Sequence, residues 1–164
     1  KEMVEGFRNY ARKVSLNLEL IDFNDLLKEV LHLYEGMDCT FTTNLSKMSL
    51  PVRVDATSVR QVLHNLLKNA TEAAQENIHP EINIRTWVKQ DKVMVQIENN
   101  GKGFSAHMLQ HAFEPYITDK AEGTGLGLAV VKKIIDEHGG RVHLANCADG
   151  EGARVTLILS LVYR

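Results

Sequence analysis

The sequence predicts one α/β (α+β) domain, a two-layer sandwich in which helices cover one face of a sheet, preceded by an N-terminal helical segment. Some segments repeat apolar residues at helical spacing, and others alternate apolar and polar residues, mostly in hairpins. The chain has 164 residues, of which 44% are hydrophobic, so it can form one domain with a real core. One sheet with helices on one face would bury every apolar stripe.

The composition argues against several classes of protein. The formal net charge is −2, so we expect no nucleic-acid partner. No apolar run approaches the roughly 18 residues that cross a membrane, and no signal-peptide pattern opens the chain. Cys39 and Cys147 lack metal-site spacing, so we expect two buried thiols and a cytoplasmic setting. Because the chain begins at Lys1, we expect a longer parent protein, and its anchoring in the inner membrane stays open.

Residues 1–17 are expected to form the end of a helical hairpin or coiled coil, with a separate domain over residues 18–164. Apolar residues recur at intervals of four, three, four and four, at Met3, Phe7, Tyr10, Val14 and Leu18. This seam is close to a heptad repeat and calls for a partner helix. A helix packed on its own domain is the alternative.

Two helices are expected in the first half of the domain. One is capped by Asp22 or Asn24 and stops at Gly36. The other follows Asp55, carries a broad apolar stripe, and ends before Pro80. Short strands are expected between the two helices, at residues 39–45 and 50–54.

The second half of the domain begins with a predicted hairpin. Residues 82–88 and 93–97 alternate apolar and polar positions on either side of "KQDK". A short helix is then expected at residues 106–112, and a longer one at residues 126–138. Two strands close the chain, at Arg141–Asn146 and at residues 154–161.

Glycines stand at the mouth of the last helix, in "EGTGLGLAVV", residues 122–131. A helix N-terminus offers free N–H groups and a positive dipole end, and glycine lets a ligand approach the backbone. These features favour an anion such as phosphate, although a lone glycine-rich turn is the simpler interpretation. The stretch matches neither a P-loop nor a dinucleotide fingerprint.

Two further features point to the same chemistry. "NNGKGF" ends a strand with Gly101 and Gly103, a second turn that exposes its backbone. Asn65 and Asn69 are four residues apart on a predicted helix, so their side chains stack on one side. An amide oxygen is a suitable ligand for Mg²⁺, although each Asn alone could simply be satisfied by backbone.

Five motifs in order resemble the catalytic ATP-binding domain of bacterial sensor histidine kinases. They are similar to the N, G1, F, G2 and G3 boxes and read "HNLLKNATEA", "IENNGKGFS", "FEPY", "GTGLGL" and "DGEGARVTL". The wording around them is most similar to nitrogen-regulation sensor kinases. The resemblance implies a Bergerat-type fold, a mixed sheet with helices on one face, that binds ATP beneath a mobile lid.

The resemblance also implies site residues. Asn69 would coordinate Mg²⁺, and Asn65 and Lys68 would approach the phosphates. The remaining residues with an implied role in binding ATP are Asn99, Gly101, Gly103, Tyr116, Lys120, Thr124, Gly125, Leu126, Gly127 and Thr156. Among these, Tyr116 would anchor the lid together with Phe113, and Thr156 would support the adenine end. Lys120, at the lid tip, would reach a phosphate or remain a solvated lysine.

Asn99 departs from the resemblance, because the family has Asp at this position to accept a hydrogen bond from the adenine amino group. Asn keeps one carbonyl oxygen but loses the charge. We therefore expect nucleotide binding to be weaker by about 1–2 kcal/mol.

The implied reaction is transfer of the ATP γ-phosphate to a histidine on the hairpin, then to the receiver domain of a response regulator. None of the seven histidines stands in an H-[ED]-x-[KR]-[NT]-P context, so the phosphoacceptor is expected upstream. Residues 1–17 resemble the end of that dimerisation and phosphoacceptor hairpin, and the parent is expected to be a homodimer.

Two alternatives remain. A gyrase-type ATP hydrolase would carry a general-base Glu four residues before the metal Asn, where this chain has Asn65, which cannot abstract a proton. A nucleotide-sensing module that has lost turnover is favoured only by Asn99.

Overall fold

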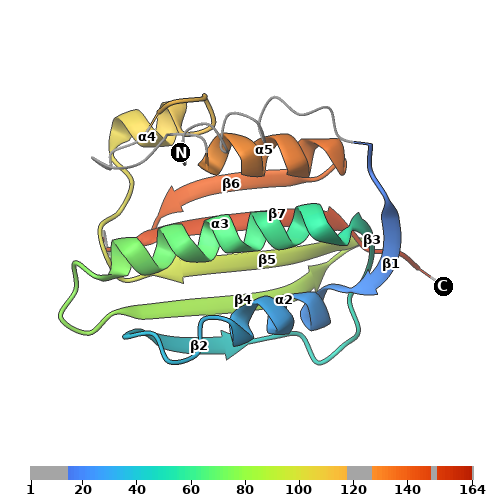
Figure 1. Cartoon of the computed structure of the whole chain (residues 1–164), viewed down its shortest axis with the longest axis horizontal. Coiled ribbons are helices and arrows are strands. Elements are labelled where there is room, and N and C mark those ends of the chain that lie inside the picture. The colour runs from blue at the N-terminus through green and yellow to red at the C-terminus, as the bar shows by residue number, and fades with distance from the viewer. Residues whose placement is uncertain (1–14, 118–126, 149–150, 164) are drawn as a thin grey trace.

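A five-stranded mixed sheet forms the core of the computed structural model, which describes residues 15–117, 127–148 and 151–163. The strand order is β2-β4-β5-β7-β6, and helices α2, α3 and α5 lie in front of one face (Figure 1). The predicted fold class, with helices on one face of the sheet, is confirmed. The sheet strands are β2 (Thr40–Asn44), β4 (Glu81–Lys89), β5 (Lys92–Asn99), β6 (Arg141–Asn146) and β7 (Ala153–Ser160).

Alternation along the strands gives the sheet one apolar and one polar face. β2 is parallel to β4, and all other neighbours in this sheet are antiparallel. On β4, Ile82, Ile84 and Thr86 are buried, while the residues between them are exposed. This period of two confirms the predicted hairpin and directs the buried set toward the helices.

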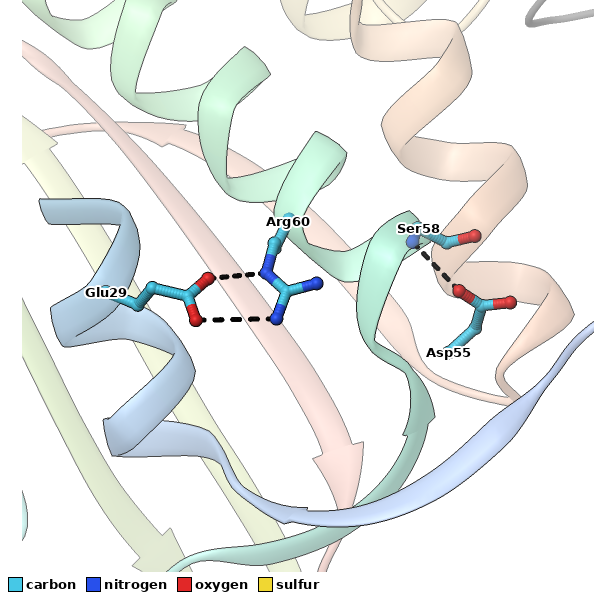
Figure 2. Close-up of polar contacts among 4 residues, drawn as sticks. All are labelled: Glu29, Asp55, Ser58 and Arg60. Atoms are coloured by element: carbon cyan, nitrogen blue, oxygen red, sulfur yellow. Dashed lines mark hydrogen bonds and ion pairs between the residues drawn. The ribbon is translucent and has the colours of Figure 1, made fainter. Parts of the chain in front are cut away.

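Helix α3 (Ala56–Ala74) lies across the middle of the sheet, between α2 (Phe23–His32) and α5 (Gly127–Glu137) (Figure 1). Asp55 is its N-cap, as predicted, and accepts a hydrogen bond from the Ser58 N–H at 3.0 Å (Figure 2). The apolar stripe of α3 is buried against the sheet, which turns the opposite, polar stripe outward.

An ion pair links α2 to α3 at the surface. Figure 2 shows the Arg60 guanidinium contacting both carboxylate oxygens of Glu29. The hydrogen bond from Arg60 holds the pKa of Glu29 below its usual value. Both side chains are about half exposed, at 41% and 55%, so the pair adds little beside the buried contacts of the same helices.

A second, two-stranded sheet was not predicted. β1 (Leu18–Asp22) pairs antiparallel with β3 (Pro51–Asp55), and Leu18 lies opposite Asp55. Leu18 therefore begins a strand and does not extend the helical seam, and residues 15–17 have no regular secondary structure. The rest of the predicted helix, residues 1–14, lies outside the described residues, and the domain division after residue 17 stays a prediction.

His138 joins the ends of α3 and α5. Its Nε2 accepts a hydrogen bond from the Asp55 N–H at 3.0 Å. Its Nδ1 lies 2.7 Å from the carbonyl oxygen of Ile134, which assigns the proton to Nδ1. This histidine is half-buried.

The remaining elements match their predicted places within a residue or two, except at the end of α2, which stops earlier than expected. α4 spans Ala106–His111, and α2 ends at His32, four residues before Gly36, which adopts a φ of +85° in the following turn. Cys39 and Cys147 form no disulfide and are half-buried, so they are more exposed than the buried thiols that we expected. Among the helices that the structure describes, none combines the length and the apolar character that crossing a membrane requires.

We predict that the free energy of unfolding falls with acid partly through Asp55. Hydrogen bonds from the N–H groups of Asn17 and Ser58 lower the pKa of Asp55. A lowered folded-state pKa stabilises the protein above the unfolded pKa of about 4, and this contribution is lost as the pH falls through the folded value. Urea unfolding of Asp55→Asn should give a flatter profile than wild type between about pH 5 and 2.

Asp55→Ala is the companion variant, because it removes the cap altogether. It should cost about 1 kcal/mol at neutral pH. Parallel pH profiles for wild type and Asp55→Asn would show that this carboxyl group does not titrate with folding.

Candidate functional site

Three elements meet at one end of the helical layer: the second half of α3, the turn after β5, and the first turn of α5. The Asn65 side chain donates from Nδ2 to the carbonyl oxygen of Gly127 at 3.4 Å. A Cβ atom at Gly127 would lie 3.9 Å from Nδ2 of Asn69. The spacing of Asn65 and Asn69 predicted that the two side chains share one side of the helix, and the structure brings both to the N-terminal end of α5.

Asn99 lies buried at the end of β5, with 7% of its surface exposed. Its Oδ1 accepts a hydrogen bond from the Gly101 N–H at 2.9 Å, which closes a local turn. Because a carbonyl oxygen has two lone pairs, this bond leaves the same atom able to accept a second hydrogen bond.

Gly101 is where the turn approaches α3. A Cβ atom at this position would lie 1.9 Å from the carbonyl oxygen of Ala73, so no larger residue fits without a backbone shift. The glycine thus sets the distance between the turn and the helix that carries Asn65 and Asn69.

Asn100 fastens the same turn to β4, a role that the sequence analysis did not identify. Its Oδ1 accepts from the Glu81 N–H at 2.9 Å, and its Nδ2 donates to the His79 carbonyl at 2.8 Å. The Asn77 side chain donates to the Asn100 carbonyl at 3.0 Å. The only sequence signal for this role is an Asn directly after a strand and before a glycine.

The last residue of β6 and Gly152, just before β7, contact the other side of the turn. The Asn146 side chain bonds to the backbone of Phe104, with Phe104 N to Oδ1 at 2.7 Å and Nδ2 to Phe104 O at 3.0 Å. Gly103 fits beneath it, since a Cβ atom there would lie 2.7 Å from Asn146 Oδ1. Gly152 has a φ of +103° and packs on the carbonyl of Asn99, which a Cβ atom would reach at 1.9 Å.

The other predicted residues take varied positions. Lys68 is exposed on α3, within the same helical turn as Asn65 and Asn69. Phe113 and Ile117 pack against the core, whereas Tyr116 is 51% exposed with a left-handed φ of 68°. The lid-anchoring roles of Phe113 and Tyr116 stay predictions, because residues 118–126 lie outside the described residues.

Thr156 lies on the sheet face opposite to Asn99. It pairs with Gln96 across β5 and β7, whereas Val155 pairs with Ile97, so Thr156 shares a face with Gln96 and not with buried Asn99. Side chains alternate between the two faces of a sheet, which places Thr156 on the face away from the helices. Ala153, Leu157 and Leu159 are the buried β7 residues on the face that carries Asn99.

Four predicted site residues lie outside the described residues: Lys120, Thr124, Gly125 and Leu126. Their roles stay predictions. The described part of the G2 motif begins at Gly127, the first residue of α5.

The side chains at this end of α3 can supply only some of the ligands that a hard cation such as Mg²⁺ needs. Within the described ranges, no group of three or more His, Cys, Asp or Glu side chains could hold a metal ion. Mg²⁺ accepts one or two protein oxygens and completes its shell with water and phosphate oxygens. A half-buried Asn69 beside the N-terminal end of α5 therefore fits Mg²⁺ carried by a polyphosphate.

The fold and this site define a class of ATPase. Residues 54–162 match the family model of histidine kinase-, DNA gyrase B- and HSP90-like ATPases, and the chain belongs to this family. Within the family, the chain is similar to the catalytic domain of histidine kinase ThkA, with 32% identity, a TM-score of 0.79, and coverage of 88% of this chain and 96% of that one. It is thus an ATP-binding domain of the histidine kinase type.

Particular relatives refine this assignment. The chain is 38% identical to sensor histidine kinase ZraS of Escherichia coli O157:H7, over 96% of this chain and 34% of that protein. It is 32% identical to nitrogen regulation protein NtrY of Azorhizobium caulinodans, over 96% of this chain and 21% of that protein. A longer ThkA chain, solved in complex with response regulator protein TrrA, aligns over 98% of this chain and 47% of its own length, with 30% identity and a TM-score of 0.83. The chain thus spans about a third or less of these curated relatives.

We predict that Gly101→Ala destabilises the domain by about 2 kcal/mol or more, because the new methyl group forces the turn off α3. Thermal unfolding measures this change. Gly36→Asn is the matched control, because Gly36 has a positive φ but nothing within 4 Å of an added Cβ, and Asn tolerates that conformation. Equal unfolding temperatures for Gly101→Ala and the control would show that the turn does not depend on this close approach.

Proposed function

We propose that this domain binds Mg²⁺–ATP between α3, α5 and the turn of residues 99–104, and transfers the γ-phosphate to a histidine on an upstream helical hairpin. From there the phosphate would pass to the receiver domain of a response regulator. The observation that carries the proposal is the convergence of Asn65 and Asn69 on Gly127, at the N-terminal end of α5.

At the phosphate end, the chain supplies amides and backbone rather than a nucleophile. The first N–H groups of α5 have no partners within the helix and carry its positive dipole end. Asn69 would give an amide oxygen to Mg²⁺, which neutralises phosphate charge when bound. Lys68, exposed one residue earlier, can reach the phosphates with its flexible ammonium group.

At the base end, buried Asn99 is the recognition group. Its Oδ1, already bonded to the Gly101 N–H, has a second lone pair for the adenine amino group. Gly101 and Gly103 keep side chains out of the space beside it.

Transfer to histidine rather than to water is supported by Asn65. A carboxamide cannot act as a general base toward water, so this position favours holding ATP intact until a protein nucleophile arrives. Positioning and charge stabilisation then supply most of the catalysis.

The longer relatives indicate the partners. ZraS and NtrY, by name a sensor kinase and a nitrogen regulation protein, are both much longer than this chain, and ThkA forms a complex with a response regulator protein. We infer that the parent protein is a homodimer, with a phosphoacceptor hairpin in its own or its partner chain. Cytoplasmic placement of this domain, with or without an anchored parent, belongs to the same proposal.

We predict Mg²⁺-dependent ATP binding that depends on Asn69. In a fluorescent-ATP titration, Asn69→Ala should weaken binding about tenfold or more and remove most of the metal dependence, because the metal loses its protein ligand. Asn44→Ala, at the far edge of the sheet, is the control and should bind like wild type. Wild-type protein that binds no ATP at high concentration would refute the nucleotide site.

Phosphate transfer separates a kinase from a nucleotide sensor. Wild-type domain mixed with a phosphoacceptor hairpin and radiolabelled ATP should label the hairpin, and Asn69→Ala should not. Tight Mg²⁺–ATP binding without any transfer would favour the sensing module.

We predict that Asn99→Asp tightens ATP binding about 5- to 30-fold, because a carboxylate accepts the adenine N–H more strongly than an amide. Isothermal titration with ATP measures the difference, and inorganic tripolyphosphate, which lacks a base, should show none. Equal ATP affinity in the two proteins would show that this side chain does not contact adenine.

A further inference from the structure

We propose that Asn146 is a positioning residue for the nucleotide base, which fixes the turn of residues 99–104 so that Asn99 faces adenine. The proposal rests on the nucleotide site described above but adds a residue outside every motif that identified the site. Asn146 is the last residue of β6, an edge strand, and its side chain is exposed.

The carboxamide of Asn146 substitutes for a strand backbone. A residue in a sheet both accepts from and donates to its neighbour, and Asn146 does this with its side chain. Its Oδ1 accepts from Phe104 N–H at 2.7 Å, and its Nδ2 donates to Phe104 O at 3.0 Å. The 42 residues between Asn146 and Phe104 make this a long-range contact, so it constrains the position of the turn and not only its local shape.

Neighbouring contacts extend this constraint to Asn99. The next residue, Cys147, donates its backbone N–H to the Gly152 carbonyl at 3.1 Å. Gly152 in turn packs on the carbonyl of Asn99, where an added Cβ would lie 1.9 Å away. Asn146, at the end of β6, therefore holds the turn at its last residue, and Gly152, just before β7, holds it at its first residue.

The opposite side of the turn is already fixed. Asn100 bonds to the Glu81 N–H and to the His79 carbonyl, and Gly101 abuts the carbonyl of Ala73. With Asn146 in place, the turn is held from the β4 side, from α3 and from β6. Without Asn146, the segment around Phe104 is free to move on one side, and ATP binding must then order the segment.

This role differs from general stabilisation in one measurable way. If Asn146 acts by orienting Asn99, its loss weakens recognition of the adenine amino group. If Asn146 merely stabilises the fold, its loss weakens the binding of all nucleotides by the same factor. Comparing ATP with purine riboside triphosphate, which lacks the 6-amino group, separates the two.

The test titrates wild type, Asn146→Ala and Asn44→Ala with both nucleotides. Asn44 is the matched control, because it too is exposed and is the last residue of an edge strand, β2, at the other side of the sheet. We expect Asn146→Ala to weaken ATP binding about 5- to 30-fold, the effect of one or two hydrogen bonds. The ratio of its affinities for ATP and for purine riboside triphosphate should fall close to one. Asn44→Ala should keep wild-type affinity and preference.

Amide hydrogen exchange gives a second readout that needs no nucleotide. The Phe104 N–H should exchange faster in Asn146→Ala than in wild type. Asn146→Asp keeps the acceptor for this N–H but places a carboxylate against the Phe104 carbonyl, so its ATP preference should be intermediate. This variant also replaces Asn146→Ala in the titration if the alanine protein does not fold.

The outcomes separate the inference from the proposed function. Wild-type protein that binds no ATP overturns both. Wild-type protein that prefers ATP, together with an Asn146→Ala protein that keeps the same preference, overturns only the role of Asn146. A loss of affinity by the same factor for both nucleotides also overturns only the role of Asn146.

Discussion

Burial of one face of α3 is the constraint on which the rest of the structure depends. Leu63, Leu66 and Leu67 are each at most 2% exposed, and burying a side chain of this kind stabilises a protein by about 1.5–3 kcal/mol. The helix cannot rotate without exposing them. Asn65 lies between these leucines in sequence and Asn69 follows them, next to buried Ala70, so the same burial fixes both carboxamides on the side that meets α5.

Close approaches of backbone to backbone complete the site. Gly101 lies against the Ala73 carbonyl of α3, and Gly152 lies against the Asn99 carbonyl. Each contact leaves no room for a Cβ atom, so these glycines determine how closely the two backbone segments approach each other. Two carboxamides, those of Asn100 and Asn146, then tie the turn to neighbouring strands in the way that a further strand would.

Long periodic segments and motif order could be predicted from the sequence, and contacts between distant residues could not. The α3 stripe, its Asp55 cap and the β4–β5 hairpin follow from local patterns. β1 was missed because Leu18 fits the spacing of the preceding seam, which hid its alternation with Leu20. The hydrogen bonds between the Asn146 side chain and the Phe104 backbone have no local sequence signal, since a lone Asn at a strand end gives no indication of its partner.

Thr156 shows a different kind of error. It alternates with Val155 and Leu157, so the strand period alone assigns it to the opposite face from them. The role of Thr156 was inferred from its position in the G3 motif, without regard to the sheet face that this alternation gives it. Asn99, whose role also came from a motif, does lie buried beside its glycine turn, because there the motif and the alternation agree.

A crystal structure with Mg²⁺ and a non-hydrolysable ATP analogue would show directly whether α3, α5 and the turn of residues 99–104 form the nucleotide site. We expect the triphosphate at the N-terminal end of α5, the metal ion on the amide oxygen of Asn69, and the adenine amino group on Asn99. An analogue bound elsewhere, or one whose metal ion does not touch α3, would contradict this expectation.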